Sequence, residues 1–245
     1  MVFCFDFFIF SCIIKTELKN KKNVEKKIQT AFLIPGQNGA GKDFVEELLK
    51  SFSNNVYCVH MREEIPLIAK NEKVIFTNRE DFIKYTTKKR KKYGAGYFVK
   101  KSLENLPETS WVIVNSMRHP DEYKEAYQYA EQVIIVAVLA CPLTASLDQR
   151  LKADIVRFNR LTKRGTVTDK FKSFDDFLAK DKKEWRPKNP HDPSAHNVEA
   201  CVQMAIEGKG FVVLNGMDDE DSVDRIKAQI RHGLLSFDLL PIGIS

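Results

Sequence analysis

Short apolar runs alternate with amphipathic segments along most of this chain. Apolar residues recur at helical spacing between the runs, as in the segment "KDFVEELLKSF". Strands that alternate with helices in this way predict βαβ units and a parallel sheet covered on both faces. The five runs that we interpret as strands are residues 30–36, 55–61, 111–116, 132–140 and 210–216.

The segments between these runs predict the helices. The last helix has acidic residues in its first turns and basic residues later, as the helix dipole favours. Ser173 is a candidate N-cap for the helix over residues 173–185. The other helices are expected at 42–52, 62–70, 79–106 with a pause at "YGAG", 119–130, 144–164 and 219–235.

The N-terminal segment differs from the rest in composition. Residues 1–14 are mostly apolar but include Asp6, and a linker rich in Lys and Asn follows them to residue 27. The apolar stretch is short for a membrane span and lacks a basic region before it. The interpretations left open are a membrane anchor or targeting segment, an extra strand, a loose tail and an artefact of the start codon. We expect a domain over residues 28–232, a tail over 233–245 and a cytoplasmic protein.

Composition and charge narrow the class of protein. A hydrophobic fraction of 43% and a charged fraction of 29% in 245 residues are typical of a globular domain. The five cysteines include no C-x-x-C pair, which favours reduced thiols over a disulfide framework. The net charge of +6 favours anionic partners. The basic run "KKRKK" at residues 88–92 fits a solvated helix face better than a nucleic-acid patch, so we expect no DNA or RNA partner.

The segment "GQNGAGKD" carries the strongest chemical signal. It fits the pattern G-x-x-x-x-G-K, and it lies between a predicted strand and an amphipathic helix. Glycines let such a loop turn its backbone N–H groups toward phosphate oxygens, and the helix offers its N-terminus to the same phosphates. We call residues 36–43 the glycine-rich loop. Its predicted nucleotide-binding residues are Gly36, Gln37, Asn38, Gly39, Ala40, Gly41, Lys42 and Asp43.

Asp43 stands where a serine or threonine hydroxyl usually ligates Mg²⁺. A carboxylate can also hold Mg²⁺, directly or through water, because this ion takes oxygen ligands and keeps several waters. Asp43 is therefore a candidate Mg²⁺ ligand, and Lys42 is expected to neutralise the β- and γ-phosphates.

Several arginines follow the loop in positions that suit phosphate. Arg118 comes just after the third predicted strand, where ligands of doubly wound sheets bind, and it can clamp a phosphate; a surface arginine is the alternative. In the helix 147–164, four arginines share one face within an arc of roughly 80°: Arg150, Arg157, Arg160 and Arg164. They predict a lid over residues 150–175, and a solvated basic face is the alternative.

Taken together, these stretches resemble the P-loop nucleotide kinases, in particular the dephospho-CoA-kinase-like and (deoxy)nucleoside monophosphate kinase-like proteins. The loop is similar to their G-x-x-G-S-G-K-D/G, and "VIVNSMRHPDE" resembles their strand ending in D-G-x-R-x-x-x-E. The segments "RFNRLTKRG", "SFDDFLAKDKKEW" and "VLNG" resemble their lid and C-terminal parts. The resemblance covers about residues 30–230.

The resemblance implies a P-loop NTPase three-layer sandwich: a five-stranded parallel sheet with helices on both faces and an arginine-rich lid. It implies ATP as phosphoryl donor, Mg²⁺, and a small nucleotide-like acceptor. Lys42, Arg118, Arg157, Arg160 and Arg164 then become the catalytic candidates. Arg62 and Arg118 are the candidates for the acceptor, and Asn215 and Gly216 for the loop that passes the adenine.

The chain departs from the family at the end of its third strand. The family usually has an aspartate there, and this chain has Asn115 and Ser116. Four functions stay open: a kinase of nucleoside or deoxynucleoside monophosphates, a dephospho-CoA or phosphomevalonate-type kinase, a nucleotide-binding regulator without turnover, and a basic RNA-associated protein, which only the run "KKRKK" and the net charge favour. The sequence indicates neither the acceptor nor the oligomeric state.

Overall fold

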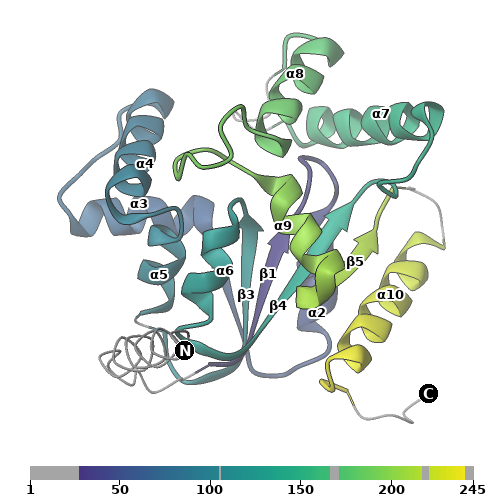
Figure 1. The fold of residues 1–245 in the computed structure, drawn as a ribbon, viewed down its shortest axis with the longest axis horizontal. Helices are drawn as coiled ribbons and strands as arrows, with labels where there is room; N and C mark the ends of the chain where they lie inside the picture. Colours follow the sequence, from purple (N-terminus) through teal and green to yellow (C-terminus); the bar gives the residue numbers. More distant parts are fainter. Residues whose placement is uncertain (1–27, 105, 166–170, 217–220, 241–245) are drawn as a thin grey trace, which may run out of the picture.

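Five parallel strands form one sheet in the order β2-β3-β1-β4-β5 (Figure 1). The computed structural model describes residues 28–104, 106–165, 171–216 and 221–240. The N-terminal 27 residues and part of the expected lid lie outside this range, so their predicted roles stay predictions. The strands are β1 (Ile28–Pro35), β2 (Val56–His60), β3 (Thr109–Met117), β4 (Ala130–Leu139) and β5 (Gly210–Leu214).

The central strand β1 lies between β3 and β4, and seven of its eight residues are buried. Such a strand is mostly apolar, because helices cover both of its faces, although Thr30 is also buried. One apolar cluster joins the sheet to α2 and α10, and a second joins the other face to α5, α6 and α9. The predicted three-layer fold with a five-stranded parallel sheet is confirmed.

The helices follow the predicted segments with shifted ends. Ser173 caps α8 as predicted, since its hydroxyl accepts from the backbone N–H of Asp176 at 3.2 Å. The α-helices are α2 (Lys42–Lys50), α3 (Met61–Asn71), α4 (Arg79–Tyr93), α5 (Tyr97–Leu103), α6 (Pro120–Ala126), α7 (Leu147–Arg164), α8 (Phe174–Trp185), α9 (Val198–Met204) and α10 (Ser222–Ser236), and a π-turn, η3 (Ala205–Lys209), follows α9.

The carboxyl edge of the sheet is where the elements converge. The loop after β1 emerges at the middle of this edge, with α7 and α8 above it and α3 and α4 to one side (Figure 1). Ligands of open parallel sheets bind at such an edge. None of the helices in the described ranges is both long and apolar enough to cross a lipid bilayer.

Candidate functional site

The glycine-rich loop connects the last residue of β1 to the first residue of α2. None of its three glycines has room for a side chain. A Cβ at Gly36 would clash with the backbone oxygen of Val138, one at Gly39 with the backbone oxygen of Arg157, and one at Gly41 with the amide of Asn215. Gly41 is also left-handed, with φ of 86°, a conformation that glycine adopts without strain. The close packing around the loop therefore explains why the motif needs glycine at all three positions.

Lys42 is buried beneath the loop that it follows. Its Nζ donates to the carbonyl oxygens of Gly36 at 3.1 Å and Gln37 at 2.9 Å. Burial, followed by the nearby charge of Arg118, lowers the pKa of Lys42 to about 7. Asp43 and Glu184 oppose this shift without cancelling it. An anionic group bound beside Lys42 would therefore strongly stabilise its charged ammonium form.

Arg157 of α7 holds the loop from above. Its guanidinium is 1% exposed and donates to both carboxylate oxygens of Asp181 at 2.9 Å, and to Asp154 at 2.6 Å. The same group donates to the backbone oxygen of Asn38 at 2.9 Å. Burial works against the charge, but these carboxylates raise the pKa of Arg157. Since hydrogen bonds to these partners occupy both terminal nitrogens of the guanidinium, Arg157 is placed to position the loop rather than to contact a phosphate. Its Nε is buried and has no hydrogen-bond partner among the described residues.

Arg160 connects the loop to the end of the sheet. Its guanidinium donates to the backbone oxygen of Gly39 at 3.3 Å and to the backbone oxygen of Asn215 at 2.9 Å. The side-chain amide of Asn215, which is buried, donates to the backbone oxygen of Ala40 at 3.0 Å. The loop, α7 and the segment after β5 are therefore joined by hydrogen bonds at one point.

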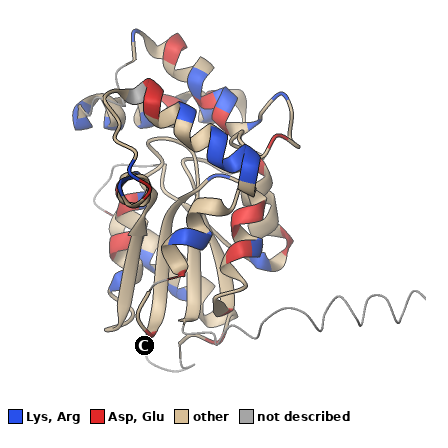
Figure 2. Cartoon of the chain, turned by 90° about the vertical axis from the view of Figure 1, so that its left-hand side faces the viewer, with Lys and Arg blue, Asp and Glu red and all other residues tan. Residues whose placement is uncertain are grey.

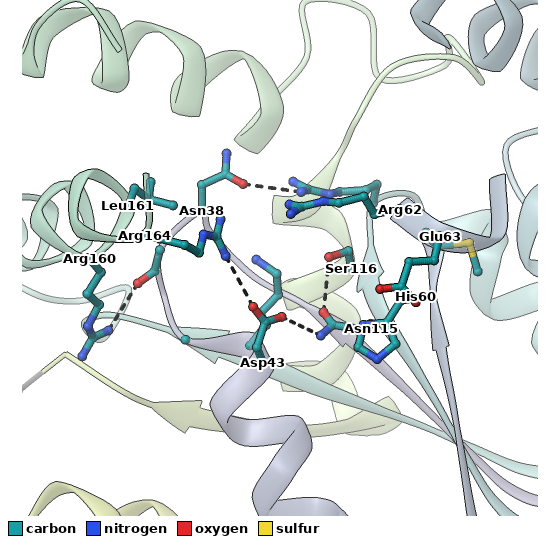
Figure 3. Close-up of a pocket in the computed structure, with 15 residues that line it drawn as sticks. Asn38, Asp43, His60, Arg62, Glu63, Asn115, Ser116, Arg160, Leu161 and Arg164 are labelled. Carbon is teal, nitrogen blue, oxygen red and sulfur yellow. Dashed lines mark hydrogen bonds and ion pairs between the residues drawn. The ribbon is translucent and has the colours of Figure 1, made fainter. Parts of the chain in front are cut away.

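Asp43 projects from the start of α2 into the cleft, with its side chain 71% exposed. One carboxylate oxygen accepts from the amide of Asn115 at 2.9 Å, and the other lies 3.4 Å from the guanidinium of Arg164 (Figure 3). An exposed carboxylate beside the loop has the oxygen donors that Mg²⁺ requires. The residues present thus fit the ion as a carboxylate-and-water site, with no second acidic side chain needed from the described ranges.

Arg118 lies beside the loop and is held by two carboxylates. Its guanidinium donates to Glu184 of α8 at 2.6 Å, and its backbone N–H donates to Glu122 at 2.8 Å. Glu184 also accepts from the side chain of Asn38 at 3.0 Å. Burial would raise the pKa of Glu184, but the hydrogen bond from His196 and the charge of Arg118 bring it well below its usual range. Glu184 thus ties α8 to the loop and to the strand-end arginine.

A cleft of about 360 Å³ separates the loop from α3. Lys42, Asp43, Arg118, Arg160 and Arg164 line one side of it. The opposite side comes from the end of β2 and the first turn of α3, including Arg62, whose side chain points into the cleft (Figure 3). The structure therefore brings all but one of the predicted catalytic residues to the cleft; Arg157 lies behind it.

A second, mostly apolar cavity of about 570 Å³ lies between α7 and α10, with Asn215 and Gly216 in its wall. A Cβ at Gly216 would clash with the backbone oxygen of Ala140, so the chain passes β4 closely here. The predicted adenine loop is thus beside an apolar cavity on the far side of Arg160 from the first cleft. Arg150 of the arginine series contacts neither the loop nor Asp43; it donates to the carbonyls of Ala145 and Leu143.

Sequence reasoning missed the acidic residues of this region. Asp181 and Glu184 lie three residues apart in "DKKEW", and both point from α8 toward the loop. This spacing puts the two carboxylates on one face of a helix, which is the signal that could have identified them. Ser116 is also unusual, because it is a non-glycine residue with φ of 74° at the strand end.

The basic run of α4 is not a uniform charged surface. Arg90 within it is buried and pairs with the buried Glu122 at 3.3 Å. Lys and Arg are interleaved with Asp and Glu on the helices that face the viewer in Figure 2.

In the described part of the chain, no group of three or more His, Cys, Asp or Glu side chains is arranged to hold a metal ion.

No family model matches the chain, and no curated protein matches it in sequence. Solved structures do match it. A gluconokinase from Sinorhizobium meliloti 1021 has 13% identity and a TM-score of 0.44, with 85% of this chain and 96% of that one covered. A shikimate kinase from Acinetobacter baumannii, in complex with shikimate, has 11% identity and a TM-score of 0.47, covering 88% and 97%.

A sugar kinase from Janibacter sp. HTCC2649 has 11% identity and a TM-score of 0.37, with 83% of this chain and 95% of that one covered. At such identities and scores, these likenesses assign neither an activity nor an acceptor to this chain.

Proposed function

We propose that the chain is an ATP-dependent phosphotransferase that transfers the γ-phosphoryl group to a nucleotide-like acceptor, a nucleoside or deoxynucleoside monophosphate. The observation that carries the proposal is the convergence of Lys42, Arg118, Arg160 and Arg164 on one cleft beside the glycine-rich loop. Phosphoryl transfer needs little covalent chemistry from a protein and depends on positioning and on stabilising the charge of the phosphoryl oxygens.

The donor half of the reaction is assigned to the loop and α2. Its backbone N–H groups and Lys42 would take the β- and γ-phosphates, and Asp43 would hold Mg²⁺ through oxygen ligands. Mg²⁺, when bound, neutralises part of the phosphate charge. The guanidinium groups of Arg160 and Arg164 lie where that charge gathers, because each contacts a residue of the loop.

The apolar cavity beside Asn215 is assigned to the adenine ring. Its walls come from Ala140, Val156 and Ile226, and burying a flat aromatic base against such side chains is favourable. The hydrogen bonds from Arg160 to Asn215 would then connect the part of the site that holds the base with the part that holds the phosphates.

The acceptor half is assigned to the strand end and α3. Arg118 and Arg62 provide two guanidinium groups for an acceptor phosphate, and a bidentate arginine–phosphate pair is strong. Dephospho-CoA and phosphomevalonate also carry phosphate, so they belong among the acceptors to be tested. One observation favours a regulator without turnover instead: Asn115 stands where the resembling kinases have a carboxylate.

Phosphotransfer from ATP with Mg²⁺ to a panel of acceptors tests the proposal. The panel holds the four common nucleoside monophosphates, their deoxy forms, dephospho-CoA and phosphomevalonate. Formation of a diphosphate product from a monophosphate acceptor, lost in Lys42→Ala, is the expected result. ATP binding by calorimetry without turnover on any acceptor would support the regulator. Absence of both binding and turnover would overturn the assignment to phosphate chemistry.

A further inference from the structure

The amide of Asn115 lies between two carboxylates that both come from α2. Its Nδ2 donates to Asp43 Oδ1 at 2.9 Å and to Glu46 Oε2 at 2.7 Å. Asn115 is 3% exposed and Glu46 is 1% exposed, so their contact is closed to solvent. A carboxamide carries two N–H donors on one nitrogen, and both are used here.

This pairing fixes which way the amide faces. A flipped amide would turn its own oxygen toward two carboxylates and leave both without a donor. Oδ1 of Asn115 must therefore face the opposite side, where it accepts from the hydroxyl of Ser116 at 3.2 Å (Figure 3). Both Asn115 and Ser116 line the cleft. The strand end thus has one side-chain amide oxygen, Oδ1 of Asn115, and this oxygen is uncharged.

Glu46 is the buried member of the set. It lies one turn after Asp43, at i+3, so the two carboxylates share a helix face. Its Oε1 lies 3.0 Å from Nε2 of His60 but makes no hydrogen bond of good geometry in the described residues. A buried carboxylate is costly unless it is well paired. The fold therefore keeps the hydrogen bond between Glu46 and Asn115 even though burying this carboxylate costs free energy.

We infer that Glu46 is a positioning residue for the strand-end oxygen and for Asp43. In this arrangement α2 supplies the negative charge, and Asn115 is the neutral partner that two adjacent carboxylates require. The asparagine is then a component of the site rather than a loss. The inference deepens the proposed phosphotransfer and rests on it for the catalytic role of Asp43; the hydrogen-bond arrangement stands independently of it.

This arrangement predicts that an aspartate at position 115 would harm the protein. Restoring an aspartate at 115 would bring three carboxylates together, at the 2.9 Å and 2.7 Å that the amide now spans. Like charges this close cannot all ionise. Asn115→Asp is therefore expected to damage the protein, and Glu46→Gln in the same chain is expected to repair it, because the amide and the carboxylate have then exchanged places.

The experiment measures thermal unfolding and steady-state phosphotransfer for five variants of the full chain. Asn115→Asp is expected to lower Tm by roughly 5 °C, and Glu46→Gln/Asn115→Asp to recover at least half of that loss. Glu46→Gln alone keeps an oxygen for Asn115 and should hold kcat within about threefold, whereas Glu46→Ala should lower kcat about tenfold with the KM for ATP unchanged. Glu47→Gln is the matched control, since Glu47 is the exposed neighbour on α2.

The outcomes separate the two proposals. If the wild type shows no turnover, the proposed function fails, and the Tm values of Asn115→Asp and the double variant still test the hydrogen-bond arrangement. An Asn115→Asp protein as stable as the wild type would overturn the inference. So would a loss of stability that Glu46→Gln leaves unchanged, or equal kcat values for Glu46→Ala and Glu47→Gln in a chain that turns over.

Discussion

The two halves of the cleft are built differently. On the loop half, Lys42, Asn38 and Arg160 each make hydrogen bonds to backbone or side-chain atoms of a neighbouring element. On the α3 half, Arg62 is exposed, and no hydrogen bond or ion pair holds it to the described residues. A preorganised group costs little to use when a ligand arrives, whereas a free one must be ordered first.

This difference indicates which half of the cleft would set the specificity for the acceptor. Under the proposed function, the loop half would bind phosphates whatever their source, because its geometry is fixed by glycines and buried charges. The α3 half would take its final arrangement from the proposed acceptor. The difference between the two halves would disappear if residues on the loop half prove dispensable. It would be supported if substitutions on the two halves change different kinetic parameters.

The largest effect is expected behind the loop. Arg157→Leu leaves Asp181 buried without its bidentate partner, and removing one member of a buried pair costs about 3–5 kcal/mol. The free energy of unfolding, measured with denaturant, should fall by that amount. Arg157→Leu/Asp181→Leu should recover part of the loss, because it removes both charges. A loss below about 1 kcal/mol in the single variant would show that α8 does not anchor the loop through this pair.

Lys42→Ala tests the loop half directly. Removal of a preorganised cation from the phosphates should lower kcat/KM about 10²–10³-fold, and ATP affinity should fall with it. Lys50→Ala is the matched control, since Lys50 ends the same helix and pairs only with Glu47 in the described residues. Equal turnover in the two variants would remove Lys42 from the reaction and with it the preorganised half of the comparison.

Arg62→Ala tests the α3 half and should change a different parameter. Losing a charged hydrogen bond to an acceptor phosphate costs about 1.5–3 kcal/mol, which is about 10–100-fold in the KM for the acceptor. The KM for ATP and the free energy of unfolding should stay at their wild-type values, because no hydrogen bond or ion pair within the described part of the chain holds Arg62. A rise in the KM for ATP instead would place Arg62 on the donor side and erase the division between the halves.

Local sequence signals predicted some parts of this site, but the side-chain contacts between distant elements could not be predicted. The glycine-rich loop and all five strands could be predicted, because apolar runs and the loop motif are local signals. The fate of each arginine on α7 could not. Periodicity places Arg157 and Arg160 on one face, but only the packing of α8 decides that Arg157 meets Asp181 and becomes buried. The two carboxylates on Asn115 depend likewise on how α2 crosses β3.

The smallest effect is a pH dependence confined to the loop half. Burial and Arg118 hold the pKa of Lys42 at about 7, with Asp43, Glu184 and Asp181 opposing them. Bound phosphate favours the ammonium and so raises this pKa. ATP affinity should therefore be level below pH 7 and fall as pH rises above it, by up to tenfold per unit. Measuring from pH 7.5 to 9 avoids the ionisation of phosphate itself near pH 6.

Lys42→Arg provides the control for that profile, because a guanidinium keeps its charge throughout this range. Its affinity for ATP should be lower than that of the wild type but independent of pH between 7.5 and 9. Acceptor binding, which we assign to Arg62 and Arg118, should be equally independent of pH in both proteins. A wild-type ATP affinity that does not change over this range would mean that Lys42 stays charged beneath the loop.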